Sequence, residues 1–321
     1  MKSRLVPLAL SFTALGLILT FGQCRKAEST PPQRVTYQPI AGEIADAFSG
    51  ANAFAHVEKI VSFGPRPPSS EGYQKTLQYL ESTLKEFGWI TSRQTFRAAT
   101  PDGPLDFTNL LARHPSAPAH PTSLPVIIGG HLDSKKLSFP FVGANDGGSS
   151  TGVMLELARV LSTKPSAAAQ IEFAFFDGEE AFRPNITPSD GLYGSKYFAH
   201  DLSTRPSWPS IGIVLDIVGD PNFPLYYNPE TPEHFAAAVE KAAPPLAFKH
   251  PLVKAPGPII DDHVPLQNTG LPCLHVIGDF QQMNYWHQPG DTLDKLTPEM
   301  LEKVGKLTLG FLSELQTPSS K

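Results

Sequence analysis

The sequence has little cysteine and no excess of positive charge. Only Cys24 and Cys273 occur in 321 residues, and 26 Lys and Arg face 31 Asp and Glu, for a net charge of −5 at pH 7. Nucleic-acid-binding proteins carry concentrated basic surfaces, so this balance argues against a nucleic-acid partner. There is also no internal repeat and no second hydrophobic core, which favours a single domain. Nothing in the sequence indicates more than a monomer.

The N-terminus carries a targeting pattern. Two basic residues precede an apolar stretch from Leu5 to Gly22, and a polar run follows Cys24. Pro7 and the abrupt polar ending argue against a membrane span and favour a signal peptide over residues 1–24. Cys24 stands where a lipoprotein carries its lipid, whereas Gln23 is atypical of that cleavage motif. We therefore expect an exported protein, either secreted or tethered to a membrane through a lipidated Cys24 in the periplasm.

Cysteine usage also limits the covalent structure of the mature protein. If Cys24 is lipidated or removed, Cys273 has no partner, so no internal disulfide forms despite an oxidising compartment. Cys273 lies in the apolar run Pro272–Ile277. We expect it to be a small buried core residue.

The rest of the chain divides into a tether and a domain. Residues 25–45 are polar and contain prolines, which is typical of a linker, and residues 46–318 form the predicted domain. Hydrophobic patterns predict strands at 89–96, 105–111, 125–129, 171–176, 211–218 and 272–277. They predict helices at about 45–63, 71–87, 152–161, 193–199, 232–243 and 298–315. Apolar strands alternating with amphipathic helices predict an α/β fold with a mostly parallel mixed sheet covered by helices on both faces.

Polar residues follow three of these strands. His131 and Asp133 come after the first core strand, Glu179 and Glu180 after the next, and Asp216 near the end of the third. In parallel sheets, ligands bind beyond the carboxyl ends of the strands. These side chains are therefore expected at one edge of the sheet.

The strongest local signal is the acidic turn after Phe176, where Asp177, Glu179 and Glu180 lie within four residues. Two unit charges about 4 Å apart repel by roughly 4 kcal/mol at an effective dielectric constant of 20. A metal ion, a shared proton or an outward-pointing acid would relieve this repulsion. Taken alone, the turn is equally compatible with an ordinary solvated strand-to-helix connection.

Other segments favour the metal. Asp146 lies among glycines just before a helix, and His287 follows a loop. Together with one glutamate of the pair, they make the mixed carboxylate and imidazole set of a catalytic zinc site, which leaves one coordination position open. The other glutamate is then free to move protons.

Six segments in order carry a specific resemblance: His131-Leu-Asp-Ser-Lys135, Gly143-Ala-Asn-Asp146, Asp177-Gly-Glu-Glu-Ala-Phe182, Leu192-Tyr-Gly-Ser195, Asp261-Asp-His-Val-Pro265 and Trp286-His287. Over roughly residues 50–316 the chain resembles the zinc aminopeptidase superfamily. Within it, the chain most resembles the glutaminyl-peptide cyclotransferases (glutaminyl cyclases). The resemblance implies conversion of N-terminal glutamine in peptides or proteins to pyroglutamate, with release of ammonia at one zinc ion.

The resemblance also implies a role for each matching residue. It assigns the zinc ligands as Asp146, Glu180 and His287. It assigns Glu179 as the general acid/base, Asp216 and Asp261 as hydrogen-bonded acids near the substrate amine, and Trp286 and His275 as substrate-pocket residues. The chain departs from the animal cyclases in two respects. Arg183-Pro184-Asn185 stands where they carry a tryptophan, and the chain cannot form their disulfide near the metal.

Two other functions remain open. An aminopeptidase with two zinc ions would use His131 and Asp216 as additional ligands, bridge the ions through Asp146, and have Glu179 activate water. Asp261 favours the cyclase, because it can share a proton with Asp216 and keep that residue off a second metal. A metal-free binding domain would be expected to have lost ligands, and none is missing here.

Overall fold

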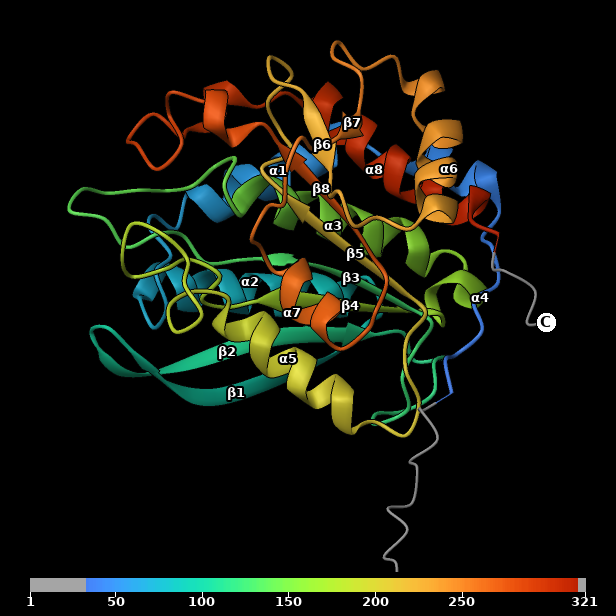
Figure 1. The fold of residues 1–321 in the computed structure, drawn as a ribbon, viewed down its shortest axis with the longest axis horizontal. Helices are drawn as coiled ribbons and strands as arrows, with labels where there is room; N and C mark the ends of the chain where they lie inside the picture. The colour runs from blue at the N-terminus through green and yellow to red at the C-terminus, as the bar shows by residue number, and fades with distance from the viewer. Residues whose placement is uncertain (1–32, 317–321) are drawn as a thin grey trace, which may run out of the picture. The chain divides into compact units, whose positions relative to one another are not determined.

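An eight-stranded mixed sheet runs through the protein (Figure 1). The computed structural model describes residues 33–316. The order of the strands is β1-β2-β4-β3-β5-β8-β6-β7. The strands are β1 (Ile90–Thr100), β2 (Gly103–Arg113), β3 (Val126–His131), β4 (Ile171–Phe176), β5 (Ile211–Asp216), β6 (Leu225–Tyr227), β7 (Val253–Lys254) and β8 (Cys273–Gly278).

The four central strands β4, β3, β5 and β8 are parallel to one another. Every residue in them is buried, as expected for strands that are covered on both faces. Antiparallel pairs β1–β2 and β2–β4 extend one side of the sheet, and β6 pairs antiparallel with β8 on the other. The mixed, mostly parallel sheet predicted from the sequence is therefore confirmed.

Helices cover the two faces unequally (Figure 1). The larger core cluster joins the sheet to α1, α2, α3, α6 and α8, and a smaller cluster joins it to α5 and α7. The helices are α1 (Gly50–Val61), α2 (Glu71–Glu86), α3 (Gly148–Ser162), α4 (Pro165–Ala168), α5 (Tyr193–Thr204), α6 (Glu233–Ala242), α7 (His263–Asn268) and α8 (Pro298–Glu314). Four short 3₁₀ helices are η1 (Gly42–Ala47), η2 (Pro244–Leu246), η3 (Phe280–Gln282) and η4 (Leu293–Lys295).

All six predicted strands and all six predicted helices are present, with shifted ends. The helix expected at 45–63 is η1 followed by α1, because Ser49 is extended and its side chain accepts a hydrogen bond from Asn52 N as an N-cap. The strand expected to reach residue 218 ends at Asp216, because Ile217 adopts a positive φ of 51°. The short elements β6, β7, α4 and α7 were not predicted.

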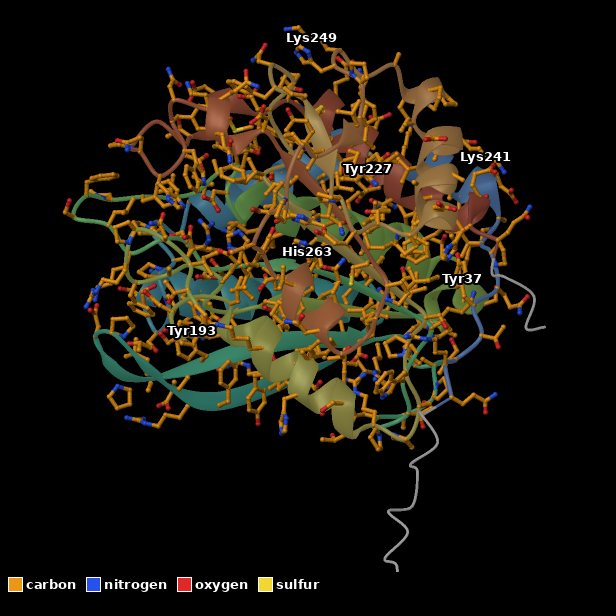
Figure 2. All side chains as sticks on the ribbon, viewed as in Figure 1. Tyr37, Tyr193, Tyr227, Lys241, Lys249 and His263 are labelled. Atoms are coloured by element: carbon orange, nitrogen blue, oxygen red, sulfur yellow. The ribbon has the colours of Figure 1, made fainter. Side chains whose placement is uncertain are left out.

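The predicted tether is packed where the structure describes it. Tyr37 is fully buried and its hydroxyl donates to the carbonyl of Leu312 (Figure 2). Ile40 and Ile44 also belong to the core. The interpretation of residues 25–45 as a linker is therefore wrong from about residue 34 onward, because apolar side chains between the polar ones reach the core.

Predictions for the signal peptide and for Cys24 lie outside the described residues. Cys273 is a free, buried cysteine, as expected. Within residues 33–316, no helix combines the length and the apolar character needed to cross a membrane.

Candidate active site and metal centre

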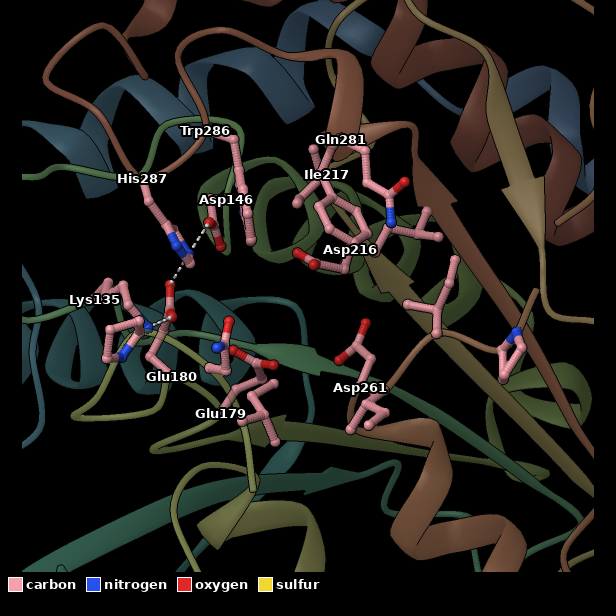
Figure 3. Close-up of a pocket in the computed structure, with 18 residues that line it drawn as sticks. Lys135, Asp146, Glu179, Glu180, Asp216, Ile217, Asp261, Gln281, Trp286 and His287 are labelled. Atoms are coloured by element: carbon pink, nitrogen blue, oxygen red, sulfur yellow. Dashed lines mark hydrogen bonds and ion pairs between the residues drawn. The ribbon is translucent and has the colours of Figure 1, made fainter. Parts of the chain in front are cut away.

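A cavity of about 250 Å³ opens at the carboxyl edge of the parallel strands (Figure 3). It is bordered by the ends of β4 and β5 and by loops from the C-terminal third of the chain. Of the predicted site residues, seven line it: Asp146, Glu179, Glu180, Asp216, Asp261, Trp286 and His287. Of the five residues expected at one sheet edge, Glu179, Glu180 and Asp216 line the cavity. The other two lie beside them, because His131 contacts Asp216 and Asp133 accepts hydrogen bonds from the backbone of the two glutamates.

Asp146, Glu180 and His287 point toward one another (Figure 3). His287 Nε2 lies 3.3 Å from Asp146 Oδ2 and 3.3 Å from Glu180 Oε1. Both of these carboxylate oxygens are buried and have no hydrogen-bond partner. Two unsatisfied carboxylate oxygens facing one imidazole nitrogen fit a zinc ion, which binds such sets with an open position. The ligand atoms lie within 4.8 Å of one another.

The turn that carries Asp146 is held by hydrogen bonds from its backbone to the side chain of Asp291. The Asp291 carboxylate accepts hydrogen bonds from Asn145 N at 2.7 Å and from Asp146 N at 3.1 Å. Gly147 has a φ of 74°, and a Cβ there would lie 2.8 Å from both Asp133 O and His131 Cε1. Only glycine fits this position. The turn can therefore approach the end of β3 closely, and Asp146 Oδ1 lies 3.2 Å from His131 Nε2.

The two glutamates after β4 are held in the same way. The Asp133 carboxylate accepts from Glu179 N at 3.2 Å and from Glu180 N at 3.4 Å. Its Oδ1 also lies 3.5 Å from His131 Nδ1. Asp133 therefore holds the acidic turn through two backbone hydrogen bonds and lies beside the imidazole of His131.

Lys135 compensates part of the negative charge. Its Nζ lies 3.1 Å from Glu180 Oε2 and donates to Ala181 O at 2.9 Å, and the side chain is buried. Burial alone would lower the pKa of Lys135, but Glu180 raises it above its usual value, so the ammonium is retained. Apart from His287, Lys135 is the one basic side chain that lines the cavity in the described part of the chain.

Arg66 joins the segment just after β3 to the loop that carries Asp146. Its guanidinium is fully buried and donates to the carbonyls of Leu132, Val142 and Gly143. Its backbone N–H donates to Ser134 Oγ. Burial lowers the pKa of Arg66 to about 10, although four acids of the site oppose this shift. Arg66 therefore holds these backbone segments together, and its positive charge offsets part of the negative charge of the site.

A second cluster lies beside the first. His131 Nε2 is 3.0 Å from Asp216 Oδ1 and 3.2 Å from Asp146 Oδ1, and all three side chains are buried. Burial alone would lower the pKa of His131, but Asp216 and its other carboxylate neighbours raise it well above its usual value. Burial raises the pKa of Asp216 to about 6 against the opposing effect of His131. These three residues can also hold a metal ion.

Asp261 lines the floor of the cavity, and its carboxylate contacts the buried side chain of His275. Burial would raise the pKa of Asp261, but His275 lowers it to about 2, since His275 Nε2 lies 2.6 Å from Asp261 Oδ2. His275 itself is fully buried and is not among the residues that line the cavity. His275 therefore contacts the cavity only through Asp261, and its role near the substrate stays a prediction.

The proton-transfer candidate is Glu179. Its side chain lines the cavity and its pKa is raised well above the usual value, first by burial and then by nearby acids including Glu180 and Asp261, against His131. A carboxyl group that takes up and releases a proton near neutral pH needs such an environment.

Two residues at the cavity have unusual backbone conformations. Ile217 has a φ of 51° and His287 a φ of 52°. Non-glycine residues in this region cost of the order of 1–3 kcal/mol and cluster at functional sites. One strained residue, Ile217, directly follows the end of β5 at Asp216, and the other, His287, carries the imidazole of the candidate metal site.

Sequence reasoning missed Arg66, Lys135 and Asp291 as parts of the site. Lys135 was visible within the motif after His131, but only as an unassigned basic residue. Arg66 among prolines and Asp291 after Gly290 carried no signal, because both act through backbone groups of distant segments.

The chain is similar to proteins of known family. The model of Peptidase family M28 matches residues 109–312. The mouse glutaminyl-peptide cyclotransferase-like protein is 32% identical over 283 residues, which is 78% of this chain and 72% of the mouse protein. The glutaminyl-peptide cyclotransferase of Boiga irregularis is 30% identical over 294 residues, with 78% and 77% covered.

Solved structures are similar along almost the whole domain. The glutaminyl cyclase of Porphyromonas gingivalis has a TM-score of 0.74 at 28% identity and covers 84% of this chain and 99% of its own. A Zn-dependent exopeptidase from Parabacteroides distasonis has a TM-score of 0.72 at 27% identity and covers 83% and 98%. The chain therefore belongs to the glutaminyl-peptide cyclotransferases within peptidase family M28.

Proposed function

We propose that this protein converts N-terminal glutamine of peptides or proteins into pyroglutamate and releases ammonia, with one zinc ion held by Asp146, Glu180 and His287. One observation carries the proposal. Two buried carboxylate oxygens without hydrogen-bond partners face His287 Nε2 in a cavity that also contains Glu179 and Asp261. A metal ligand set, a proton carrier and an amine-binding acid thus share one cavity. We expect the enzyme to act as a monomer.

When bound, zinc supplies a Lewis acid that polarises the γ-carbonyl of the glutamine side chain. Asp216 and Asp261 accept hydrogen bonds from the α-amine and hold it toward that carbon. The α-nitrogen forms a bond to the γ-carbonyl carbon, the bond from that carbon to the amide nitrogen breaks, and ammonia leaves. Glu179 takes a proton from the attacking amine and returns it to the leaving nitrogen.

The apolar side of the cavity favours this intramolecular reaction over hydrolysis. Trp286 stacks on His287 with ring centroids 4.0 Å apart, and Ile217 and Ile277 line the same wall. An apolar wall around the glutamine side chain excludes water and holds the amine near its target.

A second candidate function is aminopeptidase activity with two zinc ions. It is favoured by the adjacent cluster of His131, Asp146 and Asp216, whose ligand atoms also lie within 4.8 Å of one another. In that reaction Glu179 activates water and the N-terminal residue is released.

Metal content and ammonia release together test the proposal. His287→Ala removes the imidazole from the metal centre, whereas His234→Ala alters an exposed histidine on α6. We expect about one zinc per chain and ammonia release from a glutamine-initiated peptide for the native protein and His234→Ala, and loss of both for His287→Ala. Two zinc ions per chain with free glutamine as the product would favour the aminopeptidase.

A further inference from the structure

Three side chains of the candidate site come from three separate segments of the chain (Figure 3). Asp146 precedes α3, Asp216 ends β5, and His287 lies in the loop after η3. Asp146 and His287 are outside the helices and strands. Contacts between loops must therefore set the distances among these three side chains.

Asn145 immediately precedes the first of these residues, and each of its hydrogen-bonding groups is used in such contacts. Its backbone N–H donates to Asp291 Oδ1 at 2.7 Å, and its backbone carbonyl accepts from the Ser149 hydroxyl at 2.5 Å. Its side-chain Nδ2 donates to the Tyr285 hydroxyl at 3.0 Å, and its Oδ1 accepts from the Gly219 backbone N–H at 2.8 Å. Asn145 is fully buried, so any of these groups would be costly to leave unpaired.

The first arm of this network, the Tyr285 arm, reaches the loop that carries the imidazole. Tyr285 lies two residues before His287 and is buried. Its hydroxyl accepts from Asn145 and donates to Asp220 Oδ2 at 2.7 Å. The hydroxyl therefore ties the loop of His287 to the residue before Asp146.

The second arm, the Ser149 arm, reaches the end of β5. The Val218 backbone N–H donates to Ser149 Oγ at 2.9 Å, beside the bond from Gly219 N to the asparagine side chain. These two bonds hold the backbone just after Ile217, whose φ of 51° turns the chain directly after Asp216. A strained residue persists only where its surroundings over-determine it. Both acceptors belong to the segment at the start of α3, so this segment holds Asp216 in place.

We propose that Asn145 is a positioning residue for the whole site. Through the two arms it sets where His287 and Asp216 lie relative to its neighbour Asp146. This inference rests on the proposed function, which assigns zinc to His287 and the substrate amine to Asp216. The Tyr285 arm therefore governs zinc binding, and the Ser149 arm governs substrate binding.

The test removes one arm at a time, because replacing Asn145 itself would leave several buried groups unpaired and destabilise the fold. Tyr285→Phe and Ser149→Ala each delete one hydroxyl. Tyr226→Phe is the matched control for the first, because the Tyr226 hydroxyl also donates to a buried carboxylate, at 3.0 Å, outside the cavity lining. Ser123→Ala is the control for the second, because Ser123 is likewise buried and does not line the cavity.

Tyr285→Phe should lower zinc affinity, measured by competition with a chelator, by about 10–100-fold. At saturating zinc, its KM for a glutamine-initiated peptide should stay within about twofold of the native value. Ser149→Ala should show the opposite pattern, with KM raised by about tenfold at saturating zinc and zinc affinity within about twofold. Neither control should change either quantity.

A purely structural role would not separate zinc affinity from KM. Equal changes of both quantities in the two variants, or no change in either variant, would overturn the two-arm network. Changes of the same size in the controls would also overturn it. A native protein that binds zinc but cyclises no peptide would contradict the proposed function instead, and the zinc affinity of Tyr285→Phe would still decide whether the Tyr285 arm positions His287.

Discussion

Lys135 Nζ lies 3.1 Å from Glu180 Oε2, while the other oxygen of the same carboxylate, Oε1, faces His287 Nε2 at 3.3 Å. The two oxygens of Glu180 therefore have different partners. The ammonium of Lys135 pairs with Oε2, and Oε1 is left available to a metal ion. Groups that orient metal ligands in this way are as much a part of a metal site as the ligands.

Lys135→Met should therefore weaken zinc binding. The substitution leaves Glu180 Oε2 buried without its donor, so the carboxylate is free to rotate or to take up a proton. We expect zinc affinity, measured by competition with a chelator, to fall by about 10–100-fold. Lys136→Met is the matched control, because Lys136 is exposed and pairs with Asp102 outside the cavity. Zinc binding by Lys135→Met as tight as that of the native protein would show that the lysine does not position Glu180.

Arg66→Met should destabilise the whole domain. It leaves the carbonyls of Leu132, Val142 and Gly143 without their donor in a fully buried place. Each unsatisfied buried group costs about 1–3 kcal/mol, so we expect the free energy of unfolding in urea to fall by roughly 3 kcal/mol or more. Arg97→Met, which breaks an exposed pair with Asp106, should cost less than about 1 kcal/mol. Similar losses for both variants would refute the role given to Arg66.

Glu179→Gln should separate metal binding from turnover. Glutamine keeps the size of the side chain but no longer accepts a proton as a carboxylate does. Glu179 is not in the group formed by Asp146, Glu180 and His287, so zinc content should stay at the native level. Turnover should fall by about 10²–10⁴-fold. Glu86→Gln, on an exposed position of α2, should change neither quantity, and a fully active Glu179→Gln enzyme would rule out the proton-transfer role.

His56 should make the protein less stable in mild acid. Its Nδ1 lies 2.6 Å from the Tyr79 hydroxyl, and burial lowers its pKa below the usual 6.5, with Glu156 opposing and Arg159 assisting. Because the unfolded chain binds the proton more readily, the free energy of unfolding decreases as the pH falls through 6.5 toward the folded-state pKa. Well above pH 6.5 the histidine is neutral in both states and the effect vanishes.

The native protein and His56→Gln should therefore differ in pH dependence. We expect the variant to lose less of its unfolding free energy between pH 7.5 and 5.5 (urea denaturation at each pH). His200→Gln, which alters an exposed histidine on α5, should follow the native curve. Identical slopes for the native protein and His56→Gln would exclude this contribution.

The central strands could be predicted because their environment dictates their composition. β4, from Ile171 to Phe176, is buried on both faces and reads as a continuous apolar run. The acids that follow it, and those after β3 and β5, meet at one sheet edge for topological reasons alone. The place of Glu179 and Glu180 at this edge follows from the rule, whereas Asp146 precedes α3 and was identified by its fit to a metal ligand set.

Other features depend on contacts that no local pattern encodes. β7 contains only two residues and exists through its pairing with β6. Ile217 ends β5 with a positive φ that isoleucine does not favour, so its sequence predicts a longer strand. Arg66 and Asp291 donate to or accept from backbone groups about 70 and 145 residues away in sequence.

The most direct test of the central claim is the mass of a glutamine-initiated peptide after incubation with the zinc-loaded protein. We predict the loss of one ammonia from an otherwise intact peptide, and no such loss when the metal is removed by a chelator. Release of the complete N-terminal residue would contradict the cyclase and reassign His131 and Asp216 as ligands of a second metal ion. An unchanged peptide mass would contradict both enzymatic functions.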